Sequence, residues 1–267
     1  MMLKRIFAGH SPFRLTAIMT AGNIAVGVAS FYYMQVIVGS NPGLRGEVYK
    51  LYGGPAGFMA VGVSLNALLT IGVNAVARSI KDERSQGTFG FWTMCRRPIV
   101  SLVLQSSLGE FLLAGFNAIV TFTVLVLVFR VHFDINIPAA LLVGLVAVLC
   151  ATGVGLAAAG IYVGGGGGRN PVLWAWGLAT NFMCGVFVPI EVFTNPILRV
   201  LTHIVPNTYV LLAMRGAVLR NQPVTDPALL SQLLYPAVFA AVALFAGVLV
   251  FERGVRRALR LGGLIES

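Results

Sequence analysis

Charged side chains are scarce in this chain: Asp, Glu, Lys and Arg together make up 10% of its 267 residues. An ordinary soluble domain carries about 25%. Apolar residues reach 57%, and the mean hydropathy is +0.86. A soluble fold of this length cannot bury so much apolar surface. The composition therefore predicts an all-α integral membrane protein, with residues 1–267 forming one transmembrane domain with short loops.

Groups that catalyse reactions or bind metals are also few. The three cysteines show no CxxC spacing, which argues against a disulfide framework or a zinc site. His10, His132 and His203 fall on both sides of the membrane in the topology predicted below. The glycine run 164–168 precedes Arg169 and Asn170, so it lacks the Lys and hydroxyl of a phosphate-binding loop. We expect no catalytic, cofactor-binding or metal-binding residue, and no enzymatic activity, on this chain.

The charge that is present is mostly positive, with a formal net charge of +10. The basic residues are divided among segments that flank apolar stretches and do not form one continuous run, which argues against nucleic acid as a partner. Cytosolic loops of membrane proteins gather Lys and Arg, where these residues face anionic lipid headgroups. The positive charge therefore indicates topology, with membrane lipids as the partner.

Six stretches are apolar and long enough to be predicted as transmembrane helices, since a span needs about 20 residues. They cover residues 15–38, 55–77, 111–129, 138–162, 172–188 and 233–251. Residues 99–110 are predicted as a separate cytosolic or interfacial helix, and residues 4–14 as an interfacial helix. With both termini in the cytosol, the inner segments hold about twice as many Lys and Arg as the outer ones, so we expect a multi-pass protein of the cell membrane in that orientation.

Polar and small residues interrupt the apolar stretches. Ala151, Gly155 and Ala159 form a small-residue stripe that lets another helix approach closely. Asparagines inside predicted spans are costly in lipid, so they are expected to bond between helices or, as the less favoured reading, to line a substrate pathway. The asparagines considered for the pathway are Asn23, Asn66, Asn74, Asn117 and Asn181.

The segment 189–227 is neither a plain span nor a plain loop. Five prolines interrupt it, and 197–204 and 209–219 have helical, partly apolar character. Two short helices that dip into the outer leaflet fit this pattern.

A charged loop follows the second predicted span. Residues 82–92 combine acids, Arg84, a glycine–threonine break and aromatics that include Trp92. Large apolar side chains on a cytosolic loop indicate a docking surface, and an interfacial aromatic belt explains Trp92 equally well.

The order of residues in two segments resembles ABC type-2 transporter permeases. Glu83-Arg84-Ser85-Gln86-Gly87-Thr88, followed by Arg97-Pro98, resembles the E-R-E-x-G-T…P cytosolic loop of that family, with Ser85 where an acid is frequent. The stretch from Phe187-Val188-Pro189-Ile190 through Pro206-Asn207-Thr208-Tyr209 to Arg215 resembles its outer segment.

The resemblance implies a permease of an ABC exporter that pairs with a second permease, as a homodimer or heterodimer, and docks an ABC ATPase subunit that holds ATP and Mg. It implies a coupling helix after the second span, at Asp82, Glu83, Arg84, Gly87 and Thr88, with Trp92 as an apolar anchor. It also implies re-entrant outer helices between spans five and six. The residues of that outer segment are Pro189, Glu191, Pro206, Tyr209 and Arg215.

The expected function is export of an amphiphilic substrate such as a lipid, glycolipid or hydrophobic drug. An ion-coupled secondary transporter is one alternative, although no acid lies well inside a predicted span and no internal repeat is evident. A non-transporting membrane assembly subunit is another.

Overall fold

The computed structural model describes residues 54–94, 98–129, 133–165, 170–187, 189–190 and 195–260, together with Ala29, Tyr32, Tyr33 and Val36. The chain divides into two units, Met1–Glu47 and Val48–Ser267. The four described residues of the first unit are helical and exposed. Apart from these four, the predicted span 15–38 and the interfacial helix 4–14 lie outside the described residues, as do Asn23 and Glu191.

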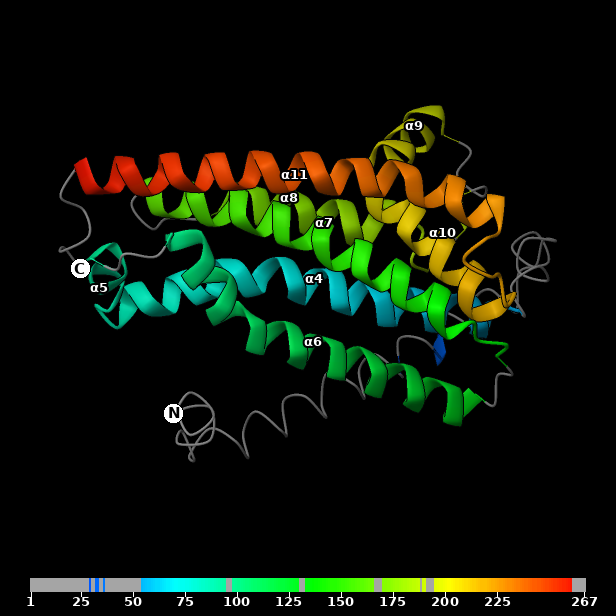
Figure 1. The fold of residues 1–267 in the computed structure, drawn as a ribbon. Coiled ribbons are helices and arrows are strands. Elements are labelled where there is room, and N and C mark those ends of the chain that lie inside the picture. Colours follow the sequence, from blue (N-terminus) through cyan, green and yellow to red (C-terminus); the bar gives the residue numbers. More distant parts are fainter. Residues whose placement is uncertain are drawn as a thin grey trace. The chain divides into compact units, whose positions relative to one another are not determined.

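Every regular element in the described part of the second unit is helical (Figure 1). The elements are α4 (Pro55–Ser85), α5 (Phe89–Met94), α6 (Ile99–Phe129), α7 (Ile137–Gly164), α8 (Pro171–Leu178), the π-helix η1 (Ala179–Met183), α9 (Pro196–Ile204), α10 (Pro206–Leu219) and α11 (Pro227–Arg260).

Asparagine and proline set where three of the helices begin. The side chains of Asn136, Asn170 and Asn195 accept hydrogen bonds from backbone N–H groups in the first turns of α7, α8 and α9. Each asparagine is followed within two residues by a proline in the first turn, where its missing N–H costs nothing. The chain thus marks these helix starts by local chemistry alone.

Four of the helices, α4, α6, α7 and α11, are long and apolar enough to cross a membrane. The pair α9 and α10, bent by 78° at Val205, would add a fifth crossing if counted as one broken span. The protein is therefore a helical, multi-pass membrane protein by length and composition. The predicted spans 55–77, 138–162 and 233–251 are confirmed as parts of α4, α7 and α11.

The predicted break before residue 111 is wrong, because α6 runs unbroken from Ile99 to Phe129. The polar residues that suggested the break are accommodated within the helix. The hydroxyls of Ser106 and Ser107 donate to the carbonyls of Val103 and Leu104, three residues earlier. The serines therefore need no water, and Glu110 lies half-buried within the same helix.

The predicted fifth span, 172–188, is not one continuous helix. Helical structure ends at Met183, and Gly185 then adopts a left-handed backbone with φ of 71°. At 1.5 Å per residue, the stretch from Pro171 to Met183 is about 20 Å long, whereas the hydrocarbon layer is about 30 Å thick. This helix alone is too short to cross a membrane.

Helix α7 lies at the centre of the second unit and packs against α4, α10 and α11. The α7–α11 contact is the most extensive, because glycines on both helices remove the side chains between the backbones. A Cβ atom at Gly153 would lie 2.6 Å from the carbonyl carbon of Ala243, and one at Gly160 would lie 2.6 Å from the Cα of Phe251. Gly247 and Gly254 meet the same two α7 glycines from the α11 side.

The predicted small-residue stripe of Ala151, Gly155 and Ala159 faces α4 and not α11. A Cβ on Gly155 would lie 3.0 Å from the carbonyl oxygen of Val73 on α4, and Ala151 lies against Gly72 on the same helix. The stripe therefore admits α4, and the separate glycine row described above admits α11.

Large apolar side chains point outward from the spans. Leu112, Phe116 and Ile119 on α6, and Val242 and Phe245 on α11, are more than half exposed. Small residues fill the helix contacts and large ones cover the surface, which suits a protein solvated by lipid.

Charged side chains of the described residues gather at one end of the second unit. Ile80, Phe89, Val103, Val255 and Ala258 pack into one apolar cluster, which brings together the last turns of α4, helix α5, the start of α6 and the last turns of α11. We call this region the charged end. Its charged residues are Arg78, Lys81, Asp82, Glu83, Arg84, Glu252, Arg253, Arg256, Arg257 and Arg260, so basic residues predominate. At the opposite end, the backbone N–H of Asn136 donates to the carbonyl of Ala217 at 2.9 Å and joins α7 to α10.

Candidate functional site

A tight reversal joins α4 to α5 at the charged end. The N–H of Gly87 donates to the carbonyl of Arg84, and the N–H of Thr88 donates to the carbonyl of Glu83 at 3.0 Å. Gly87 has φ of 68°, the left-handed conformation that this pair of bonds requires. The arrangement is a Schellman motif, in which the last orphan carbonyls of α4 are satisfied by the turn itself.

Side chains close the same reversal. The hydroxyl of Thr88 donates to the carboxylate of Glu83 and also lies 3.1 Å from the Glu83 carbonyl oxygen. The Glu83–Gly87–Thr88 pattern therefore encodes a defined change of chain direction. The structure places the resemblance-derived residues differently from expectation: Asp82, Glu83 and Arg84 lie in the last turn of the long helix α4, and the short helix after it is Phe89–Met94.

The aromatic residues of α5 divide into two groups. Phe89 is buried, and the half-buried Trp92 packs in the same cluster, with the two ring centroids 6.0 Å apart. Phe91 is 69% exposed. Trp92 thus anchors α5 to the bundle, and Phe91, together with exposed Asp82 and Gln86, forms the surface that the reversal presents.

A polar seam crosses the apolar helices between α4 and the α8–η1 segment. The amide Nδ2 of Asn66 donates to Oδ1 of Asn181 at 2.9 Å, and Asn181 donates to the carbonyl of Gly177. Asn74 donates to the carbonyl of Thr70 within α4. The seam unites two of the predicted pathway asparagines, and Asn74 lies two turns further along α4.

The seam continues to α10 through a residue that sequence reasoning did not single out. Asn207 is fully buried, and its Nδ2 donates to the hydroxyl of Thr180 at 3.0 Å. That hydroxyl in turn donates to the carbonyl of Trp176. Asn117 does not belong to this chain of bonds; it is half-buried on α6.

Several buried polar atoms at the seam have no hydrogen-bond partner among the described residues. They are Oδ1 of Asn66, Oγ1 of Thr70, Nε1 of Trp176 and Oδ1 of Asn207. An unpaired buried polar atom costs about 1–3 kcal/mol. Polar atoms left unpaired between helices are suited to bind water or the polar part of a ligand.

Arg215 is the largest fully buried side chain, with 1% exposure. Its Nε donates to the carbonyl of Phe58 at 3.2 Å, and its Nη2 donates to the carbonyls of Gly185 and Val186 at 2.8 and 3.2 Å. The guanidinium also lies 3.4 Å from the centre of the Phe58 ring, a cation–π contact. Arg215 therefore holds α10, α4 and the turn after η1 together.

Gly62 makes the space for this arginine. A Cβ at position 62 would lie 2.8 Å from Nη2 of Arg215. The sequence shows the arginine but gives no sign that a glycine 153 positions earlier is its counterpart, because only the fold brings the two together.

The predicted pair of short helices after residue 189 is confirmed as α9 and α10. Pro189 and Pro206 are buried, and Pro206 begins α10. The Tyr209 ring lies between His203 and Tyr235, and the Tyr235 hydroxyl donates to the Ile204 carbonyl at 2.6 Å. These contacts fix the bend between the two helices against α11.

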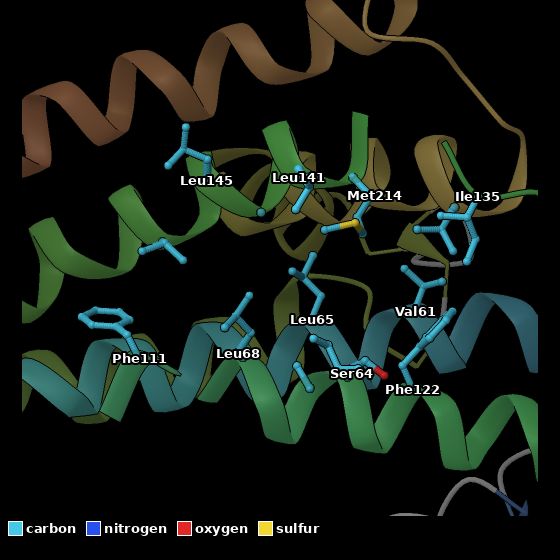
Figure 2. A pocket seen from close by; sticks show the side chains of 17 residues that line it. Val61, Ser64, Leu65, Leu68, Phe111, Phe122, Ile135, Leu141, Leu145 and Met214 are labelled. Atoms are coloured by element: carbon cyan, nitrogen blue, oxygen red, sulfur yellow. The ribbon is translucent and has the colours of Figure 1, made fainter. Parts of the chain in front are cut away.

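An apolar groove of about 580 Å³ lies between α4, α6 and α7, with Met214 of α10 at one side (Figure 2). Figure 2 shows Leu141 and Leu145 of α7 across from Leu65 and Leu68 of α4. The polar side chain in its lining is Ser64, whose hydroxyl donates to the carbonyl of Ala60 at 2.8 Å. The volume is within the range of small-molecule pockets, but the lining offers no group for acid–base or nucleophilic chemistry.

Within the described ranges, no three His, Cys, Asp or Glu side chains come close enough to hold a metal ion. Comparisons with protein-family models, with curated proteins and with solved structures find no match.

Proposed function

We propose that this chain is the transmembrane subunit of an ATP-driven ABC exporter, with ATP and Mg held by a separate ATPase subunit. The observation that carries the proposal is the reversal between α4 and α5 at the charged end. Its residues are those of the family-like motif, and its backbone is fixed by Gly87 and by the bonds from Thr88 to Glu83. A docking segment needs such a fixed shape, since ordering a loose loop would oppose binding.

Helix α4 connects the reversal rigidly to contacts within the membrane-spanning part of the bundle. It runs without a break from the reversal to Pro55 and carries Asn66 and Gly62 along the way. Through these residues it contacts η1 and Arg215. Movement of the reversal would thus be passed to the turn at Gly185 and to α10, which carries Arg215.

In the proposed arrangement both termini lie in the cytosol, and there are six crossings. They include the segment 15–38 and a fifth crossing in which α8 and η1, too short by themselves, are completed by the chain that follows Met183. A second permease copy would complete the pathway. Asn181, the exposed end of the polar seam, would face it, because Trp174, Asn181 and Phe182 are exposed along one stretch of α8 and η1. An amphiphilic substrate fits a surface that offers the amide of Asn181 together with the large apolar side chains of Trp174 and Phe182.

The topology test uses single cysteines in a Cys95→Ser background, since Cys150 and Cys184 are buried. Gln86→Cys lies on the exposed reversal and Thr225→Cys lies on the exposed turn before α11. A membrane-impermeant maleimide added to intact cells should label Thr225→Cys and leave Gln86→Cys unlabelled until the cells are opened. The reverse pattern would exclude the proposed contact with a cytosolic ATPase.

The coupling test pairs two variants with the ATPase subunit that copurifies with this chain. Glu83→Lys and Gly87→Pro should insert normally and yet lose stimulation of ATP hydrolysis, and Gln86→Ala should keep it. Wild-type transport by both altered proteins would count against a coupling role. Transport that survives ATP depletion but stops when the ion gradient is collapsed would instead favour an ion-coupled transporter.

A further inference from the structure

The last turns of α11 carry a stripe of arginines. Arg253, Arg256, Arg257 and Arg260 follow the spacing i, i+3, i+4 and i+7, so they lie on one face of the helix. All four are exposed. We call these four residues the arginine stripe.

The stripe cannot turn toward the protein, because the other face of the same turns is already packed. Phe251, Gly254, Val255 and Ala258 follow the same spacing, and all are buried. Gly254 meets Gly160 of α7, and the three other residues belong to the apolar cluster at the charged end. The orientation of the arginines is thus fixed by packing.

Like charges three and four residues apart repel each other and weaken a helix. Within the described part of the chain, one ion pair joins the stripe to an acid, Arg256 with Glu252 at 3.6 Å. The positive charge of the stripe therefore exceeds what this chain neutralises there, and an anionic partner would relieve the repulsion.

The distance along α11 identifies that partner. From Pro227 to Phe251 the helix is about 36 Å long at 1.5 Å per residue, and the hydrocarbon layer is about 30 Å thick. The stripe begins two residues after Phe251 and so falls at the depth of the lipid headgroups. Four arginines directly beyond a membrane span match the pattern of an anionic-lipid site.

We propose that the arginine stripe binds the phosphate headgroups of anionic phospholipids and thereby fixes the depth of α11 in the membrane. Guanidinium groups suit this partner because they can form paired hydrogen bonds to phosphate oxygens. The inference does not depend on transport or on an ATPase partner.

The test measures binding of fluorescent phosphatidylglycerol to the purified full chain in neutral detergent, with phosphatidylcholine as the neutral probe. Replacing Arg253, Arg257 and Arg260 by Gln should weaken phosphatidylglycerol binding about fivefold per arginine, which corresponds to about 1 kcal/mol each. Phosphatidylcholine binding should not change. Arg257→Lys, which keeps the charge, should retain most of the affinity.

The charge-matched control replaces Arg78, Lys81 and Arg199, three exposed basic residues outside the stripe, by Gln. Equal loss of affinity in this control and in the stripe variant would mean that diffuse positive charge attracts the lipid, and the proposal would be overturned. If the triple stripe variant fails to fold, Arg257→Gln alone should still show its fivefold loss. A stripe variant that keeps lipid affinity but no longer captures an ATPase subunit would assign the stripe to a protein partner and overturn the lipid assignment.

Discussion

Gly160 provides a direct test of how α7 and α11 are held together. In Gly160→Ala, the new Cβ would lie 2.6 Å from the Cα of Phe251 and 2.7 Å from its backbone nitrogen, whereas ordinary contacts begin at 3.4 Å. Both neighbours are backbone atoms, so no side chain can rotate away. The helices would have to separate by about 0.8 Å at this point.

The cost follows from what holds helices together in a membrane. Lipid is as apolar as the side chains, so association depends on close van der Waals contact, and a gap of 0.5–1 Å loses about a quarter to a half of that attraction. Overpacking of this kind costs about 1–3 kcal/mol. Alanine recovers about 0.5–1 kcal/mol through its better helix propensity, so the net destabilisation falls within about 0–2.5 kcal/mol, centred near 1 kcal/mol.

Gly144→Ala is the matched control on the same helix, because a Cβ at position 144 meets nothing within 4 Å. It should stabilise the protein by about 0.5–1 kcal/mol. Both variants are compared with wild type by thermal unfolding in one detergent. Gly160→Ala should lower Tm by several degrees, since about 1 kcal/mol shifts Tm by 2–4 °C at this size. Gly144→Ala should raise Tm slightly. Equal melting temperatures for the two variants would refute the close backbone contact.

Three further predictions concern the candidate site, all measured as unfolding in detergent. Arg215→Met should lower the free energy of unfolding by about 3 kcal/mol or more, because the carbonyls of Phe58, Gly185 and Val186 lose their donor. Arg215→Lys should restore only part of this stability. A melting temperature of Arg215→Met equal to that of wild type would contradict the role of Arg215 in holding the helices together. A double-mutant cycle of Asn66→Leu and Asn181→Leu should give a coupling of about 0.6 kcal/mol, and additive effects would show that their hydrogen bond adds nothing. Gly87→Ala should lower the free energy of unfolding by about 1–2 kcal/mol, because the backbone at this position is left-handed, with φ of 68°. Gly87→Asn should lower it less, because asparagine tolerates this conformation. Equal losses in the two variants would argue against a left-handed backbone at Gly87.

The sequence was a good guide where a structural feature depends on neighbouring residues. Apolar length predicted α4, α7 and α11, and prolines predicted the two short helices around Pro206. These features arise from local hydropathy and from the missing N–H of proline, so a window of sequence contains their cause.

The failures of prediction share a physical reason. The serines at 106 and 107 suggest water, yet each hydroxyl bonds to its own helix and leaves α6 unbroken. The stretch 172–188 is apolar enough for a span, but the helix ends before Gly185, whose carbonyl accepts a hydrogen bond from Arg215 on α10. A tertiary contact decides where that helix ends, and no local pattern records it.

The candidate site follows the same division. The sequence shows a glycine–threonine break at Gly87 and Thr88, and the bonds that close the reversal there lie within six residues. The link from Thr180 to Asn207 and the space that Gly62 leaves for Arg215 join segments far apart in sequence. A single sequence shows these residues separately and gives no reason to pair them.

The glycine contact between α7 and α11 has a consequence for biogenesis. The two helices are separated in the chain by α8, η1, α9 and α10, so the ribosome completes α7 long before α11 exists. Until α11 enters the bilayer, Gly153 and Gly160 must face lipid or a chaperone of the insertion machinery. A nascent chain stalled before residue 227 should therefore remain a substrate for membrane quality control, and the bundle becomes protease-resistant only after α11 has been inserted.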